Sequence, residues 1–264
     1  MQLINKIGKS FNDFIGNIFG IIGFFGIILN NFTHVFLRKN RYINLFIESF
    51  LDFIHLIAIK AFYTTSILSV LIGVFLILQM SNYFNISSSN IDIVIELIVV
   101  IIIRELGPLL SGIILIIKVQ SFFSIRYSLM RNNKEFEILR SLGINIYITK
   151  LIPFVLAFSI SLLTTIFYFD LLVVIFSYLV LLIKGIDISF IKFLELIIDK
   201  LSIIEVSVTL LKGLVGGLIL GVVTIYFATK VDKLSIISST VSSILTYSII
   251  LFIMINFSFS LLLY

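Results

Sequence analysis

The sequence predicts an all-α integral membrane protein, with N-terminal interfacial helices followed by about five transmembrane helices. Apolar residues make up 60% of the 264 residues, charged residues make up only 12%, and the mean hydropathy is +1.22. Apolar runs near or above the length of roughly 20 residues that a helix needs to cross a bilayer recur along the chain. A soluble domain of this length would not have this composition.

The N-terminal region, residues 1–60, does not have the pattern of a single clean span. Residues 14–29 are apolar but contain Asn17 and four glycines, which suits an interfacial or re-entrant helix better than a crossing. Residues 45–59 are amphipathic, with Glu48, Asp52 and His55 on one face. We expect this part to form interfacial and elbow helices and residues 61–264 to form the transmembrane domain.

Hydropathy places five spans in the transmembrane domain. They cover about residues 62–80, 93–123, 148–182, 206–229 and 236–263. A short polar helix is expected at about 131–143, with Asn132 or Asn133 as its N-cap and Gly143 as its C-terminal stop. Residues 186–201 are amphipathic and too charged to cross, so we expect an external helix there.

The distribution of basic residues predicts the orientation of these spans. Most of the 19 Lys and Arg residues fall in segments that lie on one side if the N-terminus is cytoplasmic. The positive-inside rule therefore predicts a cytoplasmic N-terminus, five crossings and an external C-terminus.

The most informative segment is RELGPLLSG, which begins at Arg104 and places two charges inside the second span. Arg104 and Glu105 are neighbours, so on an α-helix they point about 100° apart and are not expected to neutralise each other. They need other partners or water. One interpretation is that they face a polar cavity for a substrate with a charged head group; the other is a structural ion pair with another span, for which the candidate partners are Glu96, Lys118, Asp170 and Lys212.

Three further features lie within the spans. Gly107 and Pro108 predict a kink directly after the two charges, because proline removes one helical hydrogen bond. Gly213, Gly217 and Gly221 repeat every four residues and predict close packing of one helix face against another helix. Two polar side chains have two open interpretations each. Lys212, which directly precedes this face, either snorkels outward or meets a phosphate or carboxylate in the cavity, and Gln79, near the outer end of the first span, is either a cavity-lining or an interface residue.

The short polar helix has the pattern of a docking element. Its charged face carries Lys134, Glu137 and Arg140, and its apolar face carries Phe136, Leu139 and Leu142. A solvated loop helix would explain the charges alone. An amphipathic helix at the end of a span favours insertion into a groove on a cytoplasmic partner.

Composition and motifs also exclude several classes of function. The chain contains no cysteine, no glycine-rich nucleotide-binding loop and no Ser/His/Asp set, so neither thiol chemistry, ATP hydrolysis nor a catalytic site is expected. Glu48, Asp52 and His55 fit a solvated helix face better than a metal site. The net charge of +5 is explained by the loops and does not suggest nucleic acid, and no removable signal peptide is recognisable.

The chain resembles the Mla-type (MCE-associated) permease family, the membrane subunits of ABC transporters that move phospholipids. The resemblance covers about residues 73–243 and depends on GVFLILQ, RELGPLLSG, the spacing from there to LRSLG, the proline in KLIPFVLA, and LLKGLVGGLILG. It implies a homodimer of five-span subunits around a lipid cavity open to the periplasm, with a cytoplasmic ABC ATPase and a periplasmic MCE-domain protein as partners. It also implies that this chain holds no cofactor, because ATP and Mg²⁺ bind the partner ATPase.

Carried over by motif position, the resemblance assigns residues to two roles. Gln79, Arg104, Glu105 and Lys212 become cavity or cavity-support residues, and Lys134, Glu135, Phe136, Glu137, Leu139, Arg140 and Leu142 form the helix that couples to the ATPase. The chain departs from the family at Lys134 and Arg140, where charge is reversed, so we expect either an ATPase partner that has changed to match or an altered coupling.

The location and the competing functions follow from these features. The resemblance implies a bacterial inner (cytoplasmic) membrane or an organellar inner envelope. The alternative function is a membrane scaffold or assembly protein that anchors a cytoplasmic partner without transport. A membrane-embedded enzyme ranks third, because no nucleophile or metal cluster is recognisable.

Overall fold

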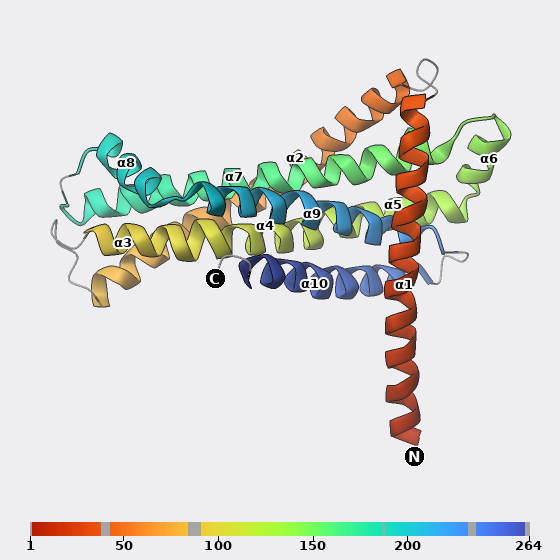
Figure 1. Cartoon of the computed structure of the whole chain (residues 1–264), viewed down its shortest axis with the longest axis horizontal. Helices are drawn as coiled ribbons and strands as arrows, with labels where there is room; N and C mark the ends of the chain where they lie inside the picture. Colours follow the sequence, from red (N-terminus) through yellow and green to blue (C-terminus); the bar gives the residue numbers. More distant parts are fainter. Residues whose placement is uncertain (1, 38–42, 84–90, 187, 232–235, 262–264) are drawn as a thin grey trace.

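The fold is helical throughout the part of the chain that the computed structural model describes, which is residues 2–37, 43–83, 91–186, 188–231 and 236–261 (Figure 1). The α-helices are α1 Gln2–Leu37, α2 Ile43–Tyr83, α3 Ile91–Leu97, α4 Gly107–Leu115, α5 Ser121–Asn132, α6 Glu135–Ser141, α7 Ile152–Ile183, α8 Phe190–Lys200, α9 Ile203–Ala228 and α10 Ile237–Leu261. Three π-helical segments join some of them: η1 Ile98–Leu106, η2 Ile116–Gln120 and η3 Tyr147–Leu151. The described residues contain no strand, so the predicted all-α class is confirmed.

Most of the long helices run along one common axis. Figure 1 shows α2, α7, α9, α10 and the chain from α3 to α5 extended along the molecule, with α6 at one end and α8 at the other. Five described helical segments are long and apolar enough to cross a membrane: Asn12–Phe32, Ile43–Met80, Tyr147–Ile183, Ile203–Ala228 and Ile237–Leu261. The protein is therefore an integral membrane protein, although this set of five differs from the predicted spans at two places.

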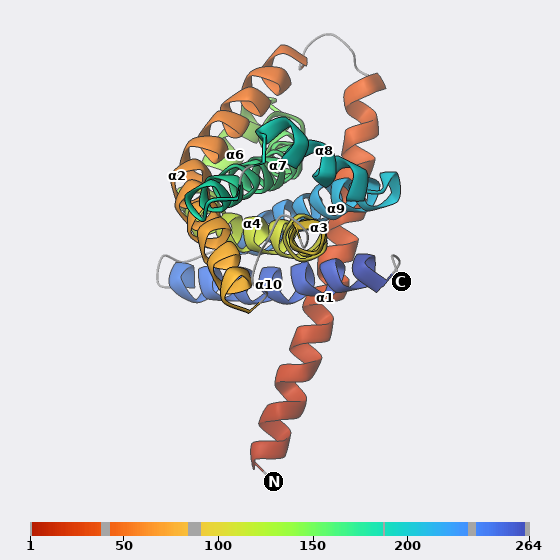
Figure 2. The same cartoon turned by 90° about the vertical axis from the view of Figure 1, so that its left-hand side faces the viewer.

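The first difference is α1, which has the length and hydropathy of a span but a different direction. Figures 1 and 2 show α1 running across the bundle at the end that carries α6. It contacts the ends of α9 and α10, where Asn17 donates to the Tyr247 hydroxyl at 2.9 Å and the Phe24 and Tyr226 rings lie 6.0 Å apart. α1 thus runs transverse to the bundle although its segment Asn12–Phe32 is apolar enough to span, and its interfacial position stays a prediction.

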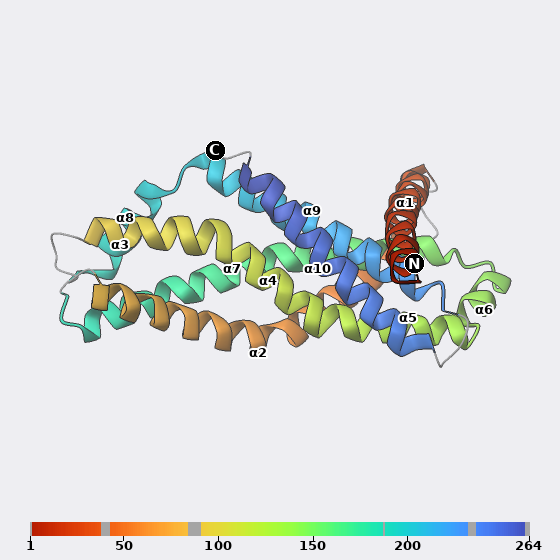
Figure 3. The ribbon, with the colours of Figure 1, turned by 90° about the horizontal axis from the view of Figure 1, so that it is seen from below.

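The second difference is the span predicted at about residues 93–123. The structure is helical from Ile91 to Asn132, but α-helical and π-helical segments alternate along it. Pro108 stands in the first turn of α4, directly after the π-helical η1. In Figure 3 the helix changes direction between the labels α3 and α4, in the part of the chain where Gly107 and Pro108 predict a kink.

The elbow helix and the first span are not separate elements. Residues 45–59 and 62–80 both belong to the single helix α2, so the expected boundary near residue 60 falls within a helix. No glycine or proline occurs between residues 43 and 72 to stop it. The expected basic break at residues 38–41, most of the polar turn at 81–90 and the turn at 232–235 lie outside the described residues.

Two apolar clusters form the interior, one toward each end of the bundle. Near α6, the Phe154 ring lies 4.8 Å from that of Phe123 and 5.6 Å from that of Phe53, which joins α7, α5 and α2. Toward α8, Phe169 and Phe193 are fully buried among the aliphatic side chains of α3, η1 and α7. The polar residues of the second span lie toward the α8 end, within reach of this second cluster.

Candidate functional site

The charges of the second span meet side chains from α9 and α10 in one connected cluster. Lys212 Nζ donates to the Arg104 carbonyl oxygen at 3.0 Å, to Glu105 Oε2 at 3.2 Å and to Ser260 Oγ at 2.9 Å. Ser260 Oγ also donates to Glu105 Oε2 at 2.6 Å. Arg104 donates through Nη1 to Glu205 Oε1 at 3.4 Å. The cluster therefore connects η1, α9 and α10.

Arg104 and Glu105, which are adjacent within the RELGP motif, form an ion pair with each other, contrary to our expectation. Arg104 Nε lies 3.2 Å from Glu105 Oε1. Both residues lie in η1, and a π-helix has more residues per turn than an α-helix, so the angle between successive side chains is smaller than 100°. Both side chains are also long enough to bend toward one another. The geometry thus supports the second interpretation, a structural ion pair between spans, in which Lys212 is the partner on another span.

The burial of these groups differs strongly. The side chains of Lys212 and Arg104 are 1% and 9% exposed, whereas that of Glu105 is 37% exposed. A buried ammonium or guanidinium group is costly unless it is paired and hydrogen-bonded. Glu105 supplies a carboxylate to both cations, so the cluster depends on it.

A cavity of about 550 Å³ lies beside this cluster, between η1, α7, α8 and α9. Its wall is mostly apolar, and its charged groups are Arg104, Asp170 and Glu205. The apolar lining comes from Ile103, Phe167, Leu171, Val174, Ile175, Phe190, Leu194, Ile197, Leu201 and Val206, with Thr209 as a further polar member. The volume lies in the range of small-molecule sites, and charge at one side of an apolar wall suits an amphipathic ligand.

The glycine stripe of α9 explains where this cavity begins. A Cβ at Gly221 would lie 3.0 Å from the Val155 Cα of α7, and a Cβ at Gly213 would lie 3.2 Å from the Leu163 Cα. A Cβ at Gly217 would collide with the α7 backbone. The two helices therefore pack closely along this stripe. Before its first member, Gly213, the side chains of α9 are larger, and Thr209 and Glu205 line the cavity. The cavity opens where the glycines end.

The predicted cavity residues take different positions. Arg104 lines the cavity, whereas Glu105 and Lys212 stand behind it and hold Arg104 in place. Gln79 is half-buried on α2 and has no hydrogen bond to the cluster. In the described part of the chain, Arg104, Glu105 and Lys212 thus come together and Gln79 does not join them.

Over the described ranges of the chain, the other residues considered as ion-pair partners of Arg104 and Glu105 form no bond with the cluster. Glu96 pairs with Lys200 of α8 at 3.2 Å, and Lys118 is exposed. Asp170 is buried beside Gly107, where a Cβ would collide with its carboxylate, and its Oδ1 has no hydrogen-bond partner among the described residues. Neither Glu96 nor Lys118 belongs to the cluster.

Sequence reasoning missed Glu205, which pairs with Arg104. Its signal was present as a capping box: Ser202 Oγ accepts from the Glu205 backbone N–H at 3.1 Å, and Glu205 Oε2 accepts from the Ser202 backbone N–H at 3.0 Å. This motif starts α9 at Ile203, slightly before the predicted span. The carboxylate thereby caps its own helix while its other oxygen faces the guanidinium group.

Comparison with known proteins identifies the family. A model described as "Permease MlaE" matches residues 50–262 of the 264. The chain belongs to the MlaE permease family. No curated protein sequence matches the chain. The match includes the α2 segment before residue 73, where the sequence resemblance began.

Membership of the MlaE family makes this chain a permease subunit of an ABC transporter for lipids. Such a subunit is not expected to catalyse a reaction. Within the described residues, no group of three or more His, Asp or Glu side chains has the geometry of a metal site.

The predicted coupling helix of this MlaE-family permease is α6, at the end of the bundle opposite α8 (Figure 1). Phe136 is buried and Leu139 packs on the core, so these two residues hold α6 to the bundle. The apolar side chains left exposed are Ile138, at 55%, and Leu142, at 69%. Leu142 was predicted on the apolar face. Ile138 was not, although it lies one helical turn from Leu142.

The start of α6 also differs from the prediction. Asn132 ends α5, and Lys134 precedes α6 with a left-handed backbone, φ +57°, and no side-chain cap. The proposed asparagine N-cap is therefore wrong, because a tight turn between two helices occupies these residues. Gly143 adopts φ +74° after the helix, as expected for its C-terminal stop. Glu137 forms a long ion pair with Arg131 at 3.8 Å.

Proposed function

We propose that this permease moves phospholipids, with the cavity between η1, α7, α8 and α9 as the place where one lipid binds. The observation that supports this most directly is the arrangement of that cavity. Its volume is about 550 Å³, its wall is mostly apolar, and Arg104 lies at its border. A phospholipid is amphipathic, so its phosphate suits the guanidinium group and an acyl chain suits the apolar wall.

The hydrogen bonds of Arg104 suggest how a phosphate is exchanged. The contact between Arg104 Nη1 and Glu205 Oε1, at 3.4 Å, is the longest in the cluster, and both residues line the cavity. A lipid phosphate that approaches from the cavity replaces Glu205 as the partner of that nitrogen. Glu105 stays in contact with the guanidinium group, and Lys212 stays bonded to the Arg104 carbonyl oxygen, so Arg104 keeps its position.

The driving force comes from a separate cytoplasmic ABC ATPase, which binds ATP and Mg²⁺ and docks on α6. The exposed Ile138 and Leu142 lie one turn apart and suit a helix-in-groove contact. Exposed Lys134, Glu137 and Arg140 surround them and set which ATPase fits. In this arrangement α6 lies on the cytoplasmic side of a bacterial inner membrane or organellar envelope, with the N-terminus on the same side.

Two further partners belong to the proposal. A second copy of the chain completes a homodimer, for which α10 offers the exposed side chains of Ile253, Met254, Phe257 and Leu261. A periplasmic MCE-domain protein receives or delivers the lipid at the α8 end. The exposed side chains of α10 also suit direct contact with bilayer lipid. Cross-linking of two tagged copies in membranes distinguishes a dimer interface from a lipid-facing surface.

Filling the cavity tests the proposed function. Leu194 of α8 lines the cavity, so Leu194→Trp is expected to remove most of the phospholipid that co-purifies with the transporter in mild detergent. Ile191 lies on the same helix, is 70% exposed and does not line the cavity, so Ile191→Trp is the matched control. Lipid is counted by mass spectrometry. Equal lipid content in both variants would exclude this cavity as the lipid site.

The competing scaffold function predicts a different result. A scaffold needs the ion pairs that hold η1, α9 and α10 together, but it has no need of an apolar cavity with a charged border. If the Leu194→Trp protein folds, retains its partners and supports cell growth under membrane stress as well as the unaltered chain, the scaffold function is favoured.

A further inference from the structure

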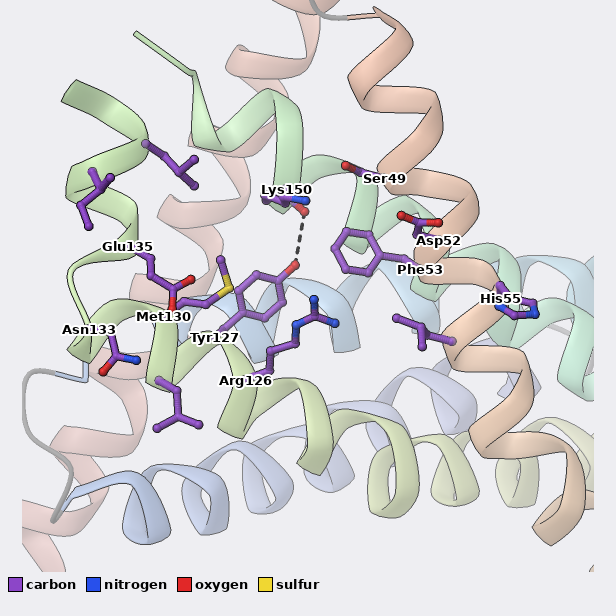
Figure 4. Close-up of a pocket in the computed structure, with 14 residues that line it drawn as sticks. Ser49, Asp52, Phe53, His55, Arg126, Tyr127, Met130, Asn133, Glu135 and Lys150 are labelled. Atoms are coloured by element: carbon purple, nitrogen blue, oxygen red, sulfur yellow. Dashed lines mark hydrogen bonds between the residues drawn. The ribbon is translucent and has the colours of Figure 1, made fainter. Parts of the chain in front are cut away.

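A second pocket lies at the other end of the bundle, where α2, α5 and α6 meet (Figure 4). Its volume is about 830 Å³. Figure 4 shows Ser49, Asp52, Phe53 and His55 of α2 on one side and Arg126, Tyr127, Met130, Asn133 and Glu135 on the other, with Lys150 above them. This pocket is separate from the cavity beside Arg104 and shares no residue with it.

The charges of this pocket are balanced but do not neutralise each other. Two cations, Arg126 and Lys150, and two carboxylates, Asp52 and Glu135, face the same space. Within the described residues none of these four groups forms an ion pair with another, whereas the cluster at Arg104 is fully connected. Opposite charges that face one pocket without pairing are complementary to a ligand that itself carries both signs.

Beside the four charged groups and the polar side chains of Ser49, His55 and Asn133, the lining has an apolar part. Phe53, Leu56 and Leu139 contribute to it, together with Leu129, Met130 and Ile138. The Tyr127 hydroxyl, which would add a further polar group, is already used, because it donates to the Lys150 carbonyl oxygen at 3.3 Å. A free soluble zwitterion would leave this apolar surface uncovered, so the pocket suits an amphiphile.

The seam between α2 and α5 continues from the pocket toward the centre of the bundle. Lys60 Nζ of α2 lies 3.7 Å from the centre of the Phe122 ring of α5, about one helical turn beyond Arg126. Apolar side chains near this contact are exposed, among them Ile59 at 59% and Ile125 at 44%. Acyl chains that leave the pocket along this seam therefore meet apolar protein surface and bilayer lipid.

We propose that this pocket binds the head group of a zwitterionic phospholipid from the leaflet on the α6 side. The phosphate lies toward Arg126 and Lys150, and the primary amine lies toward Asp52, on the α2 side of the pocket. Glu135 is the first residue of α6, so bound lipid contacts the helix on which the ATPase is proposed to dock. The site senses the lipid composition of that leaflet and is distinct from the transport cavity.

The absence of tryptophan from the chain allows a specific test. Leu129→Trp places one fluorophore in the pocket lining, and Ile236→Trp places one outside it, near the first turn of α10. Each full-length protein is reconstituted in phosphatidylglycerol bilayers, and brominated phosphatidylethanolamine, which quenches tryptophan, is titrated in. We expect the Leu129→Trp probe to report at least about tenfold preference for phosphatidylethanolamine and the Ile236→Trp probe to report none.

Variants of the pocket separate head-group recognition from general contact with lipid. Asp52→Asn combined with Arg126→Gln, in the Leu129→Trp background, is expected to abolish the preference, because both ends of the head group lose a charged partner. Lys118→Gln removes an exposed cation from the same continuous helical segment outside the pocket and is expected to leave the preference unchanged. Circular dichroism of each variant checks that its helices are intact.

The outcomes that contradict the proposal are specific. Equal quenching at both probe positions, or equal quenching by brominated phosphatidylglycerol and phosphatidylethanolamine, would show that no head group is selected. A fluorescence change of the Leu129→Trp probe only when the ATPase is added would show a protein-binding surface instead. Displacement of the brominated lipid by free phosphoethanolamine would support recognition of the head group itself. Failure of cavity-filling at Leu194 would not affect any of these results.

Discussion

The contact between Lys212 and Glu105 provides a quantitative test of the polar cluster. Lys212→Met keeps the length of the side chain and removes a donor to three acceptors, at 2.9 to 3.2 Å. The attraction between Nζ and the Glu105 carboxylate at 3.2 Å is about 5 kcal/mol at an effective dielectric constant of roughly 20. Burial of the ammonium group offsets part of this, and exposure of Glu105 weakens the rest. We expect a coupling energy of about 2 kcal/mol.

The assay is a double-mutant cycle with Lys212→Met, Glu105→Gln and the double variant. The free energy of unfolding is measured by titrating SDS into mixed micelles and following circular dichroism. The matched control is the pair Lys200 and Glu96, which has the same separation of 3.2 Å but side chains 40% and 60% exposed. Its coupling energy is expected to be near zero.

Two results would refute this reasoning. A coupling energy below about 0.5 kcal/mol for Lys212 and Glu105 would show that burial does not strengthen the pair. Equal coupling in both pairs would show the same. The cycle also separates stability from transport. If the cluster positions Arg104 for a phosphate, the Lys212→Met protein that remains folded carries less phospholipid, whereas a purely structural cluster leaves the lipid content per folded molecule unchanged.

Three further predictions test other parts of the structure. Ile138→Asp is expected to weaken binding of the ATPase at least about tenfold in a pull-down titration, because it places a charge on the exposed apolar face of α6, whereas Ser141→Asp on the same helix has little effect. Gly217→Ala is expected to lower the free energy of unfolding by about 2 kcal/mol or more, because its Cβ collides with the backbone of α7. Gly23→Ala, where a Cβ meets nothing within 4 Å, is the control and leaves it equal or higher. Asp170→Asn is expected to raise the unfolding temperature, because it replaces a buried carboxyl group, with which no cation among the described residues pairs, by a neutral amide of the same shape; a lower temperature would contradict this.

The sequence predicted the helical class, a short amphipathic helix at the position of α8 and most spans, because these depend on local composition. For α1, the sequence favoured an interfacial or re-entrant helix over a crossing, whereas its length and hydropathy also suit a span. Its direction depends on contacts such as the one between Asn17 and Tyr247, 230 residues apart. No local pattern records such a contact.

The site was predicted in part for the same reason. Arg104, Glu105 and Lys212 were recognised because charge within a span is rare, and they do come together. Their mutual geometry was not predictable, because it depends on the π-helical conformation of η1. Glu205 was overlooked because its capping motif lies at the end of a span, where a carboxylate is ordinary. Ion pairing across helices becomes visible only when the helices are packed.

The arrangement of the glycine stripe and the cavity limits which helices can move when lipid enters. From Gly213 to Gly221 the backbones of α7 and α9 are in contact, so these two helices move together as one unit. The cluster at Arg104 fastens η1 and α10 to the same unit. The remaining wall of the cavity is α8. Its polar contacts with the bundle include the exposed ion pair of Lys200 with Glu96. An exposed pair of this kind contributes little to stability. If lipid enters this cavity as proposed, α8 is therefore the wall expected to move, while Arg104 keeps its position on the other side of the cavity.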